Sequence, residues 1–182
     1  MIRVVLLGDS IRQHYQPLVA QLLEETCTVW GPQENCAFAK WTLYALRFWR
    51  EQLSCADVIH WNNGLHDVVR FFQEDGCFVS LEEYRDSVLK IARELRKTGA
   101  KVIFATTTPI LKDDHERTNA DIIRYNREVV PLLEKMGVVI DDLHACVSAD
   151  PQGYISQDGT HMNDLGKMAC ARAVAASIRS VC

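Results

Sequence analysis

Two segments far apart in the chain carry residue types that together could cleave an acyl bond. Gly8-Asp9-Ser10 follows a short apolar run, and Asp158-Gly159-Thr160-His161 precedes an alanine-rich stretch. A serine hydroxyl becomes a nucleophile when an imidazole takes its proton and a carboxylate orients that imidazole. Ser10, His161 and Asp158 are therefore the candidates for nucleophilic catalysis.

Each of these segments also has a simpler explanation. Where a strand passes into a helix, a serine can serve simply as the cap of that helix. An aspartate and a histidine three residues apart commonly form a solvated pair in a loop. Their positions favour the chemical interpretation. Ser10 follows the first predicted strand and His161 lies between the last predicted strand and the last helix, so both belong to the carboxyl edge of a parallel sheet.

A third polar segment, residues 62–67 with the sequence Asn-Asn-Gly-Leu-His-Asp, leaves the same predicted edge after the third strand. Acyl transfer requires hydrogen-bond donors directed at the oxyanion of the tetrahedral intermediate, and this segment offers several. The alternative is an ordinary loop whose side chains bond its own backbone.

The hydrophobic pattern predicts the elements that position these residues. Short apolar runs rich in β-branched residues predict strands, and segments with an apolar face every three to four residues predict helices. The predicted strands are 4–7, 26–30, 57–61, 101–106 and 138–140, and the predicted helices are 17–23, 41–53, 81–98, 118–136 and 163–179. This alternation predicts βαβ crossovers and a parallel sheet, while residues 68–79 give no clear pattern.

Local signals refine several boundaries. Pro17 suits the first position of a helix, and Ser80 with Glu83 forms a capping box that opens the long helix. Gly99 is expected to end that helix, and Pro131 is expected to kink or split the next one. Residues 141–162, rich in Asp, Gly and Ser, are predicted to form a loop.

Bulk properties limit the class of protein. The chain has 182 residues, 48% of them hydrophobic, and a net charge of −4. We expect one domain over 1–182, no nucleic-acid partner because no basic stripe is present, and no membrane span because no apolar run reaches about 18 residues. Seven irregularly spaced cysteines without a Cys-x-x-Cys pair predict no metal site. Without an evident export segment, we expect reduced thiols and a cytoplasmic protein.

Taken together, the three polar segments resemble the motifs of the SGNH (GDSL-type) hydrolase superfamily. Gly8-Asp9-Ser10 matches the family's Gly-Asp-Ser, Asp158 and His161 match its Asp-x-x-His, and residues 64–67 occupy its Gly-x-Asn-Asp. The resemblance implies a three-layer α/β/α sandwich with a flavodoxin-like five-stranded parallel sheet and no cofactor. It also implies that Ser10 is the nucleophile, His161 the general base, Asp158 its orienting partner, and the Ser10 N–H an oxyanion donor.

The chain departs from this pattern at two positions. His66 replaces the family's oxyanion asparagine; a neutral imidazole can donate one N–H, and Asn62 or Asn63 is the alternative donor. Lys40 stands where the family has a glycine whose backbone N–H serves the oxyanion hole, and Gly31 fits that place less well.

The resulting expectation is a serine esterase that removes short acyl groups from a small molecule or carbohydrate, because few residues remain for a lid or a deep acyl channel. A binding protein on the same fold with a decayed site is the first alternative, and a flavodoxin-like protein for a phosphate-bearing ligand is the second.

Among the other histidines, His60 is expected in the core, and His144 near Asp142 lacks a serine partner by any motif. Nothing in the sequence predicts the oligomeric state.

Overall fold

A five-stranded parallel sheet forms the centre of the molecule. The computed structural model describes residues 1–72, 74 and 76–182. The strands are β1 (Ile2–Leu7), β2 (Cys27–Trp30), β3 (Val58–Asn62), β4 (Lys101–Ala105) and β5 (Val139–Asp141). Their spatial order is β2-β1-β3-β4-β5, and all neighbouring pairs are parallel. This is the flavodoxin-like order that the resemblance implied.

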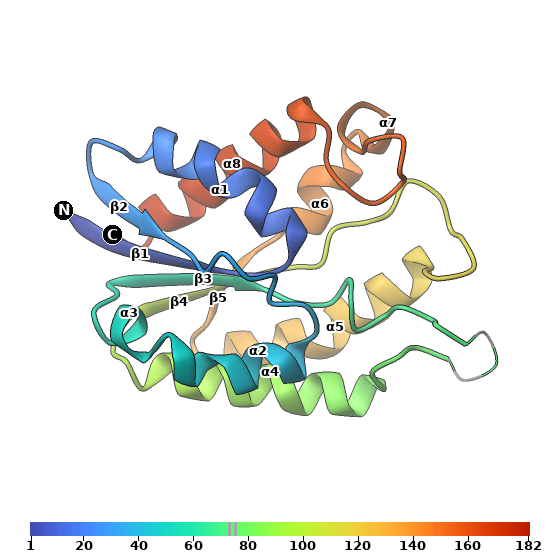
Figure 1. Ribbon diagram of the computed structural model, residues 1–182, viewed down its shortest axis with the longest axis horizontal. Helices are drawn as coiled ribbons and strands as arrows, with labels where there is room; N and C mark the ends of the chain where they lie inside the picture. The colour runs from blue at the N-terminus through green and yellow to red at the C-terminus, as the bar shows by residue number, and fades with distance from the viewer. Residues whose placement is uncertain (73, 75) are drawn as a thin grey trace.

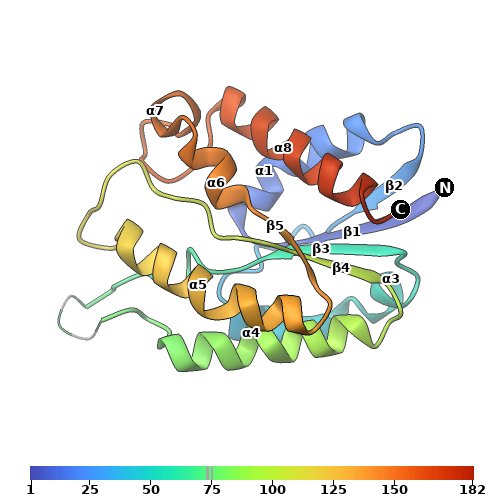
Figure 2. The ribbon, with the colours of Figure 1, turned by 180° about the vertical axis from the view of Figure 1, so that it is seen from behind.

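Helices cover both faces of the sheet, so the predicted three-layer α/β/α sandwich is confirmed (Figures 1 and 2). One layer contains α1 (Ser10–Leu22), α6 (Leu143–Ser148), α7 (Pro151–Tyr154) and α8 (Asp164–Arg179). The other contains α2 (Ala39–Ala45), the 3₁₀ turn η1 (Leu46–Phe48), α3 (Arg50–Ser54), α4 (Leu81–Arg96) and α5 (Asn119–Lys135). Within the described residues, no helix has the length and apolar character needed to cross a membrane.

The central strands supply the core because helices pack against both of their faces. Leu6, Leu7 and Ile59 are fully buried, and Trp61 on β3 packs against Phe104 on β4 with ring centroids 4.8 Å apart. Burial of such side chains contributes roughly 1.5–3 kcal/mol each. The core therefore fixes the strands whose carboxyl ends carry the polar segments.

The prediction that the first helix begins at Pro17 is wrong. Helix α1 begins at Ser10, and Pro17 lies inside it. Residues 11–16 look polar in the sequence, yet Ile11, Arg12 and Tyr15 are all buried on the sheet side of the helix. The buried arginine hid the amphipathic pattern, because a charged residue is counted with the solvent face.

The predicted helix over 41–53 is three short pieces, α2, η1 and α3. Trp49 leaves the helical conformation with φ −107° and ψ 18°, and this bend lets Leu46, Trp49 and Leu53 all enter the core.

Pro131 does not split α5, which is one uninterrupted helix. Because Pro131 lies on the exposed face, water can bind the carbonyl that its missing N–H leaves free.

The prediction of a loop over residues 141–162 is wrong in part, because this segment contains α6 and α7. Asp142 caps α6 by accepting from Ala145 N–H, and Asp150 caps α7 by accepting from Gly153 N–H. None of the described residues among 68–79 belongs to an α-helix or to a strand of the sheet; Gln73 and Asp75 lie outside the description. The capping box at Ser80 is confirmed as the start of α4.

Arg12 joins the first helix to the loop that follows β2. Its side chain is 1% exposed and donates to the carbonyl oxygens of Gly8 (3.1 Å), Pro32 (2.8 Å) and Glu34 (2.9 Å). The contacts to Gly8 and Pro32 are buried, so loss of the guanidinium would take a donor from acceptors that water does not easily reach. The guanidinium therefore holds the turn that carries Ser10 against the neighbouring loop.

We expect Arg12→Met to lower the free energy of unfolding by about 3 kcal/mol, because it removes the buried hydrogen bonds that the guanidinium donates to the Gly8 and Pro32 carbonyls. Urea denaturation followed by circular dichroism measures this change. Arg124→Met, at an exposed position of α5, is the matched control and should change stability by less than about 0.5 kcal/mol. Equal effects of the two substitutions would contradict the role assigned to Arg12.

Candidate active site

Three polar segments meet at the carboxyl edge of the sheet (Figure 1). Ser10 follows β1, residues 63–67 follow β3, and residues 155–163 lead into α8. β1 and β3 are paired neighbours, with Leu7 opposite Trp61, so the segments that follow them leave the sheet side by side. The sheet pairing thus brings together residues that are far apart in sequence.

The turn before Ser10 is held on both sides. Gly8 N–H donates to Cys36 Sγ at 3.2 Å, and Cys36 N–H donates to the Gly8 carbonyl at 3.0 Å. A Cβ on Gly8 would collide with the side-chain oxygen of Asn62, so the close approach of the two strands requires glycine. Asp9 is the helix cap, since its carboxylate accepts from Ile11 N–H at 3.0 Å. The cap is therefore Asp9, and the Ser10 hydroxyl is free for other contacts.

Ser10, His161 and Asp158 form one chain of hydrogen bonds. Ser10 Oγ lies 2.9 Å from His161 Nε2, and His161 Nδ1 lies 2.8 Å from Asp158 Oδ2. The imidazole is thus placed between a hydroxyl and a carboxylate. This arrangement can move a proton from the serine oxygen to the ring while the carboxylate stabilises the imidazolium.

Asp158 is fixed by its own turn. Its Oδ1 accepts from the backbone N–H groups of Thr160 and His161, each at 2.9 Å, and from Ser156 Oγ at 2.8 Å. Partial burial opposes ionisation, but these hydrogen bonds outweigh it and hold the pKa of Asp158 well below its usual range. Gly159 has φ +79°, a conformation that lets this turn close. Asp158 is therefore an ionised carboxylate with both oxygens engaged.

The hydroxyl and the imidazole open into a small pocket of about 200 Å³. The pocket is lined by Ser10, Leu65, His66, Arg117, Asp158, Thr160 and His161. Burial lowers the pKa of His66; the Asp9 carboxylate opposes this shift, and the Arg117 cation adds to it. The neutral imidazole is therefore favoured, and it can donate one N–H into the pocket.

The other predicted donors lie elsewhere. Asn63 Nδ2 donates to the Ala37 carbonyl at 3.0 Å and to Thr42 Oγ1 at 2.9 Å, so both of its amide hydrogens are used within the protein. Asn62 ends β3 with its side-chain oxygen against Gly8. Neither asparagine lines the pocket.

Lys40 and Gly31 are also outside the pocket lining. Lys40 lies in the first turn of α2, where backbone N–H groups have no acceptor within the helix, and its ammonium group is 3.7 Å from Glu83 at the surface. Gly31 directly follows β2 and packs against the Gln16 side chain and the Leu6 carbonyl.

Two pocket neighbours were not predicted from the sequence. His14 lies one turn after Ser10 on α1, with its ring centroid 5.2 Å from that of His161, and partial burial together with His161 lowers its pKa. A correct start for α1 would have placed His14 on the same face as Ser10 by the four-residue spacing. Arg117 comes from the loop before α5, and no local pattern marks it.

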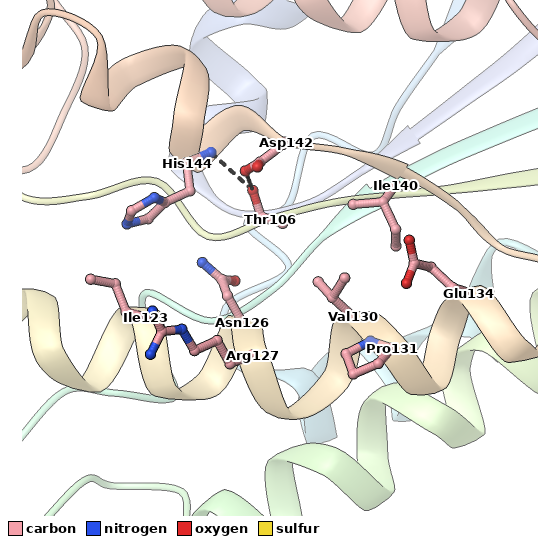
Figure 3. A pocket seen from close by; sticks show the side chains of 10 residues that line it. All are labelled: Thr106, Ile123, Asn126, Arg127, Val130, Pro131, Glu134, Ile140, Asp142 and His144. Atoms are coloured by element: carbon pink, nitrogen blue, oxygen red, sulfur yellow. Dashed lines mark hydrogen bonds between the residues drawn. The ribbon is translucent and has the colours of Figure 1, made fainter.

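A larger cavity of about 500 Å³ lies between α5 and the β5–α6 segment (Figure 3). His144 and Asp142 both line it, but Asp142 Oδ1 accepts from Thr106 Oγ1 at 2.8 Å and from Ala145 N–H at 3.1 Å. His144 Nδ1 is 3.4 Å from Ser148 Oγ, a neighbour on the same helix. His60 is buried in β3, as expected, and bonds Asp141 at 2.9 Å. Ser10 and its partners lie outside this cavity.

Asp67 anchors the segment that carries His66. Its Oδ1 accepts from Ala39 N–H, at the start of α2, at 2.9 Å, and the side chain is fully buried. Burial raises the pKa of Asp67 to about 8, more than the hydrogen bond from Ala39 lowers it. The carboxyl group is therefore protonated at neutral pH.

The scan against protein-family models and the search of curated proteins find no match to this chain. Solved structures do match. An acetyl xylan esterase has a TM-score of 0.81 and 20% identity, over 97% of this chain and 100% of its own. A lipase/acylhydrolase from Enterococcus faecalis has a TM-score of 0.82 and 17% identity, over 99% and 96%. A GDSL-like lipase from Bacteroides thetaiotaomicron has a TM-score of 0.74 and 15% identity, over 99% and 89%.

These matches cover the chain from end to end at low identity, and what they establish is the fold. The molecule has the three-layer SGNH-hydrolase fold that the sequence motifs implied.

Asp67 makes the stability of the fold depend on pH. Its pKa of about 8 in the folded chain exceeds the ordinary value of 3.8, so the folded state holds the proton more tightly. The stabilisation is complete below pH 4 and is lost as the pH rises through 8, by up to about 1.4 kcal/mol per pH unit. Unfolding in urea at pH 5, 7 and 9 measures this loss.

Asp67→Asn should remove this slope, because the amide keeps an oxygen for Ala39 N–H and does not titrate. Glu24→Gln, at an exposed position of the same chain, should keep the wild-type slope. If Asp67→Asn retains the full slope, another group carries the pH dependence.

Proposed function

We propose that this chain is a single-domain serine esterase that cleaves acyl esters through an acyl-serine intermediate. The hydrogen-bond chain from Ser10 through His161 to Asp158, open to a pocket at the carboxyl edge of the sheet, is the observation that carries the proposal. The fold shared with esterases and acylhydrolases supports it.

In the proposed reaction, Ser10 Oγ attacks the ester carbonyl carbon while His161 Nε2 takes the serine proton. The carbonyl oxygen becomes an oxyanion, and Asp158 stabilises the imidazolium. The tetrahedral intermediate then collapses, and the leaving alcohol receives the proton from His161. A water molecule attacks the acyl-serine with His161 again as base, which releases the carboxylic acid and restores the Ser10 hydroxyl. No cofactor takes part.

The oxyanion needs donors on the side of the carbonyl away from His161. We assign this role to the Ser10 N–H and to the neutral ring of His66, which lines the pocket. Asn63 is not assigned, because its amide hydrogens are engaged. The backbone N–H of Lys40 is not assigned, because Lys40 lies outside the pocket lining.

The size of the pocket bears on the substrate. A space of about 200 Å³ fits a short acyl group better than a fatty acyl chain. One of the similar structures is described as an acetyl xylan esterase, which supports a short acyl group on a small molecule or carbohydrate as the substrate class.

All seven cysteines are free thiols, which supports the cytoplasm as the place of action.

Ser10→Ala should lower kcat/KM for 4-nitrophenyl acetate by at least about 10³-fold and abolish labelling by a fluorophosphonate probe, because no other hydroxyl in the described part of the chain bonds the His161 ring. Continuous absorbance assays and mass spectrometry of the labelled peptide measure both. Ser148→Ala, which removes the hydroxyl beside His144, is the matched control and should leave both unchanged. A wild-type protein that neither hydrolyses esters nor takes the label would favour a binding protein with a decayed site.

His66→Ala should lower kcat by about 10²–10³-fold with little change in KM, because the lost donor acts on the oxyanion and not on the bound ester. His66→Asn should retain more of the wild-type kcat than His66→Ala, since its amide can also donate. Steady-state kinetics on a neutral acetyl ester separates the two constants. An unchanged kcat in His66→Ala would rule His66 out as oxyanion donor.

A further inference from the structure

The pocket beside Ser10 is lined by one guanidinium and by a carboxylate that is already engaged by other residues. Among the described residues, Asp158 is the one carboxylate in the lining, and both of its oxygens are engaged by Ser156, Thr160 and His161. Arg117 is the one cation that the described lining holds besides the histidines, and a guanidinium is an always-charged donor. The lining group able to bind an anionic part of a ligand is therefore Arg117.

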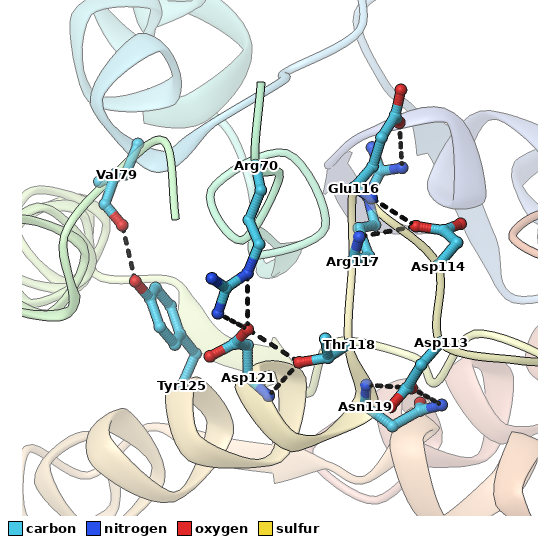
Figure 4. Close-up of polar contacts among 10 residues, drawn as sticks. All are labelled: Arg70, Val79, Asp113, Asp114, Glu116, Arg117, Thr118, Asn119, Asp121 and Tyr125. Atoms are coloured by element: carbon cyan, nitrogen blue, oxygen red, sulfur yellow. Dashed lines mark hydrogen bonds and ion pairs between the residues drawn. The ribbon is translucent and has the colours of Figure 1, made fainter. Parts of the chain in front are cut away.

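Arg117 is held so that its guanidinium faces this pocket. Its backbone N–H donates to Asp114 Oδ1 at 2.7 Å, within a loop whose polar contacts are drawn in Figure 4. Its Nε donates to the Leu65 carbonyl at 2.9 Å, directly before His66. The side chain is only 16% exposed. Both ends of the residue are thus fixed, and the charged group lies beside the candidate oxyanion donor.

The charge of Arg117 is only partly balanced. Glu116 contacts Nη1 at 3.3 Å from the solvent side, with its side chain 47% exposed. Nη2 has no hydrogen-bond acceptor among residues 1–72, 74 and 76–182. Arg70 is a useful contrast in the same region, because its Nε and Nη2 both donate to Asp121 on α5 (Figure 4). Arg70 is used for structure, whereas Arg117 keeps a donor for a ligand.

We propose that Arg117 selects ester substrates that carry a carboxylate or phosphate group within reach of the pocket. This inference rests on the proposed esterase function and names the substrate class of that same site. A guanidinium that is mostly shielded from water binds an oxyanion by charge-assisted hydrogen bonds, and such bonds are about twice as strong as neutral ones. Arg117 is then a specificity-determining residue and takes no part in proton transfer.

The test compares matched esters with and without the charge. On the acyl side, 4-nitrophenyl hydrogen succinate is compared with 4-nitrophenyl butanoate. On the alcohol side, 4-acetoxybenzoate and 4-acetoxyphenyl phosphate are compared with methyl 4-acetoxybenzoate. The wild type should favour the anionic member of at least one pair by about 10-fold or more in kcat/KM. The pair that shows the preference identifies whether the anion is on the acyl or the alcohol side.

Arg117→Met should abolish this preference, measured as a ratio within each variant so that a general loss of activity cancels. Glu116→Gln should increase the preference, because it removes the negative charge that partly balances Arg117. Arg70→Met is the matched control, since it removes a neighbouring arginine outside the pocket lining, and it should keep the wild-type ratio. If Arg117 acted only on the oxyanion of the reaction, Arg117→Met would slow hydrolysis of both members of a pair equally. This result would overturn the inference.

A binding experiment separates the inference from the esterase proposal. Calorimetry with the Ser10→Ala variant should show tighter binding of 4-nitrophenyl hydrogen succinate than of 4-nitrophenyl butanoate, and Ser10→Ala/Arg117→Met should show no difference. Ser10-dependent hydrolysis without any anionic preference would overturn the inference and leave the esterase proposal standing. Anion-selective binding without hydrolysis would support the inference and overturn the esterase proposal.

Discussion

The parallel pairing of β1 with β3 is the constraint on which the rest of the site depends. With Leu7 opposite Trp61, the two strands end at the same level, and the segments that carry Ser10 and His66 leave one edge of the sheet together. α8 packs along α1, which brings the turn of His161 back to the same edge (Figure 2). Ser10 and His161, distant in sequence, thus come within hydrogen-bond reach, and His66 lines the same pocket.

Buried polar groups hold this edge in shape. Arg12 satisfies three backbone carbonyls around the nucleophile turn, and Asp67 ties the His66 segment to the start of α2. In both cases burial makes the group costly to lose, because a partner left behind would be unpaired in a low-dielectric interior. Burial also favours the neutral forms of Asp67 and His66, so packing decides the charge of the site as well as its geometry.

Charge distribution connects this architecture to substrate choice. The Asp158 carboxylate bonds its own turn and His161, whereas Arg117 lines the pocket from the loop before α5, and its Nη2 has no acceptor among the residues that the structure describes. The pocket is small, and its lining includes the Arg117 guanidinium and the His66 ring as donors. A compact, acceptor-rich ester fits these features, and the anionic group proposed for it follows from the same imbalance.

The sequence by itself determined the class of fold and singled out Ser10, Asp158 and His161, which the structure joins by hydrogen bonds. Alternating strands and helices, the cap at Ser80 and the motifs around Ser10 and His161 are local patterns, and local patterns survive without knowledge of the fold. Only the tertiary structure decided the rest. The start of α1 was hidden by Arg12, whose charge is satisfied by carbonyls on a different loop, and Trp49 bends its helix to reach the core. Arg117 enters the pocket because it bonds the Leu65 carbonyl, a contact between distant loops that no sequence period records.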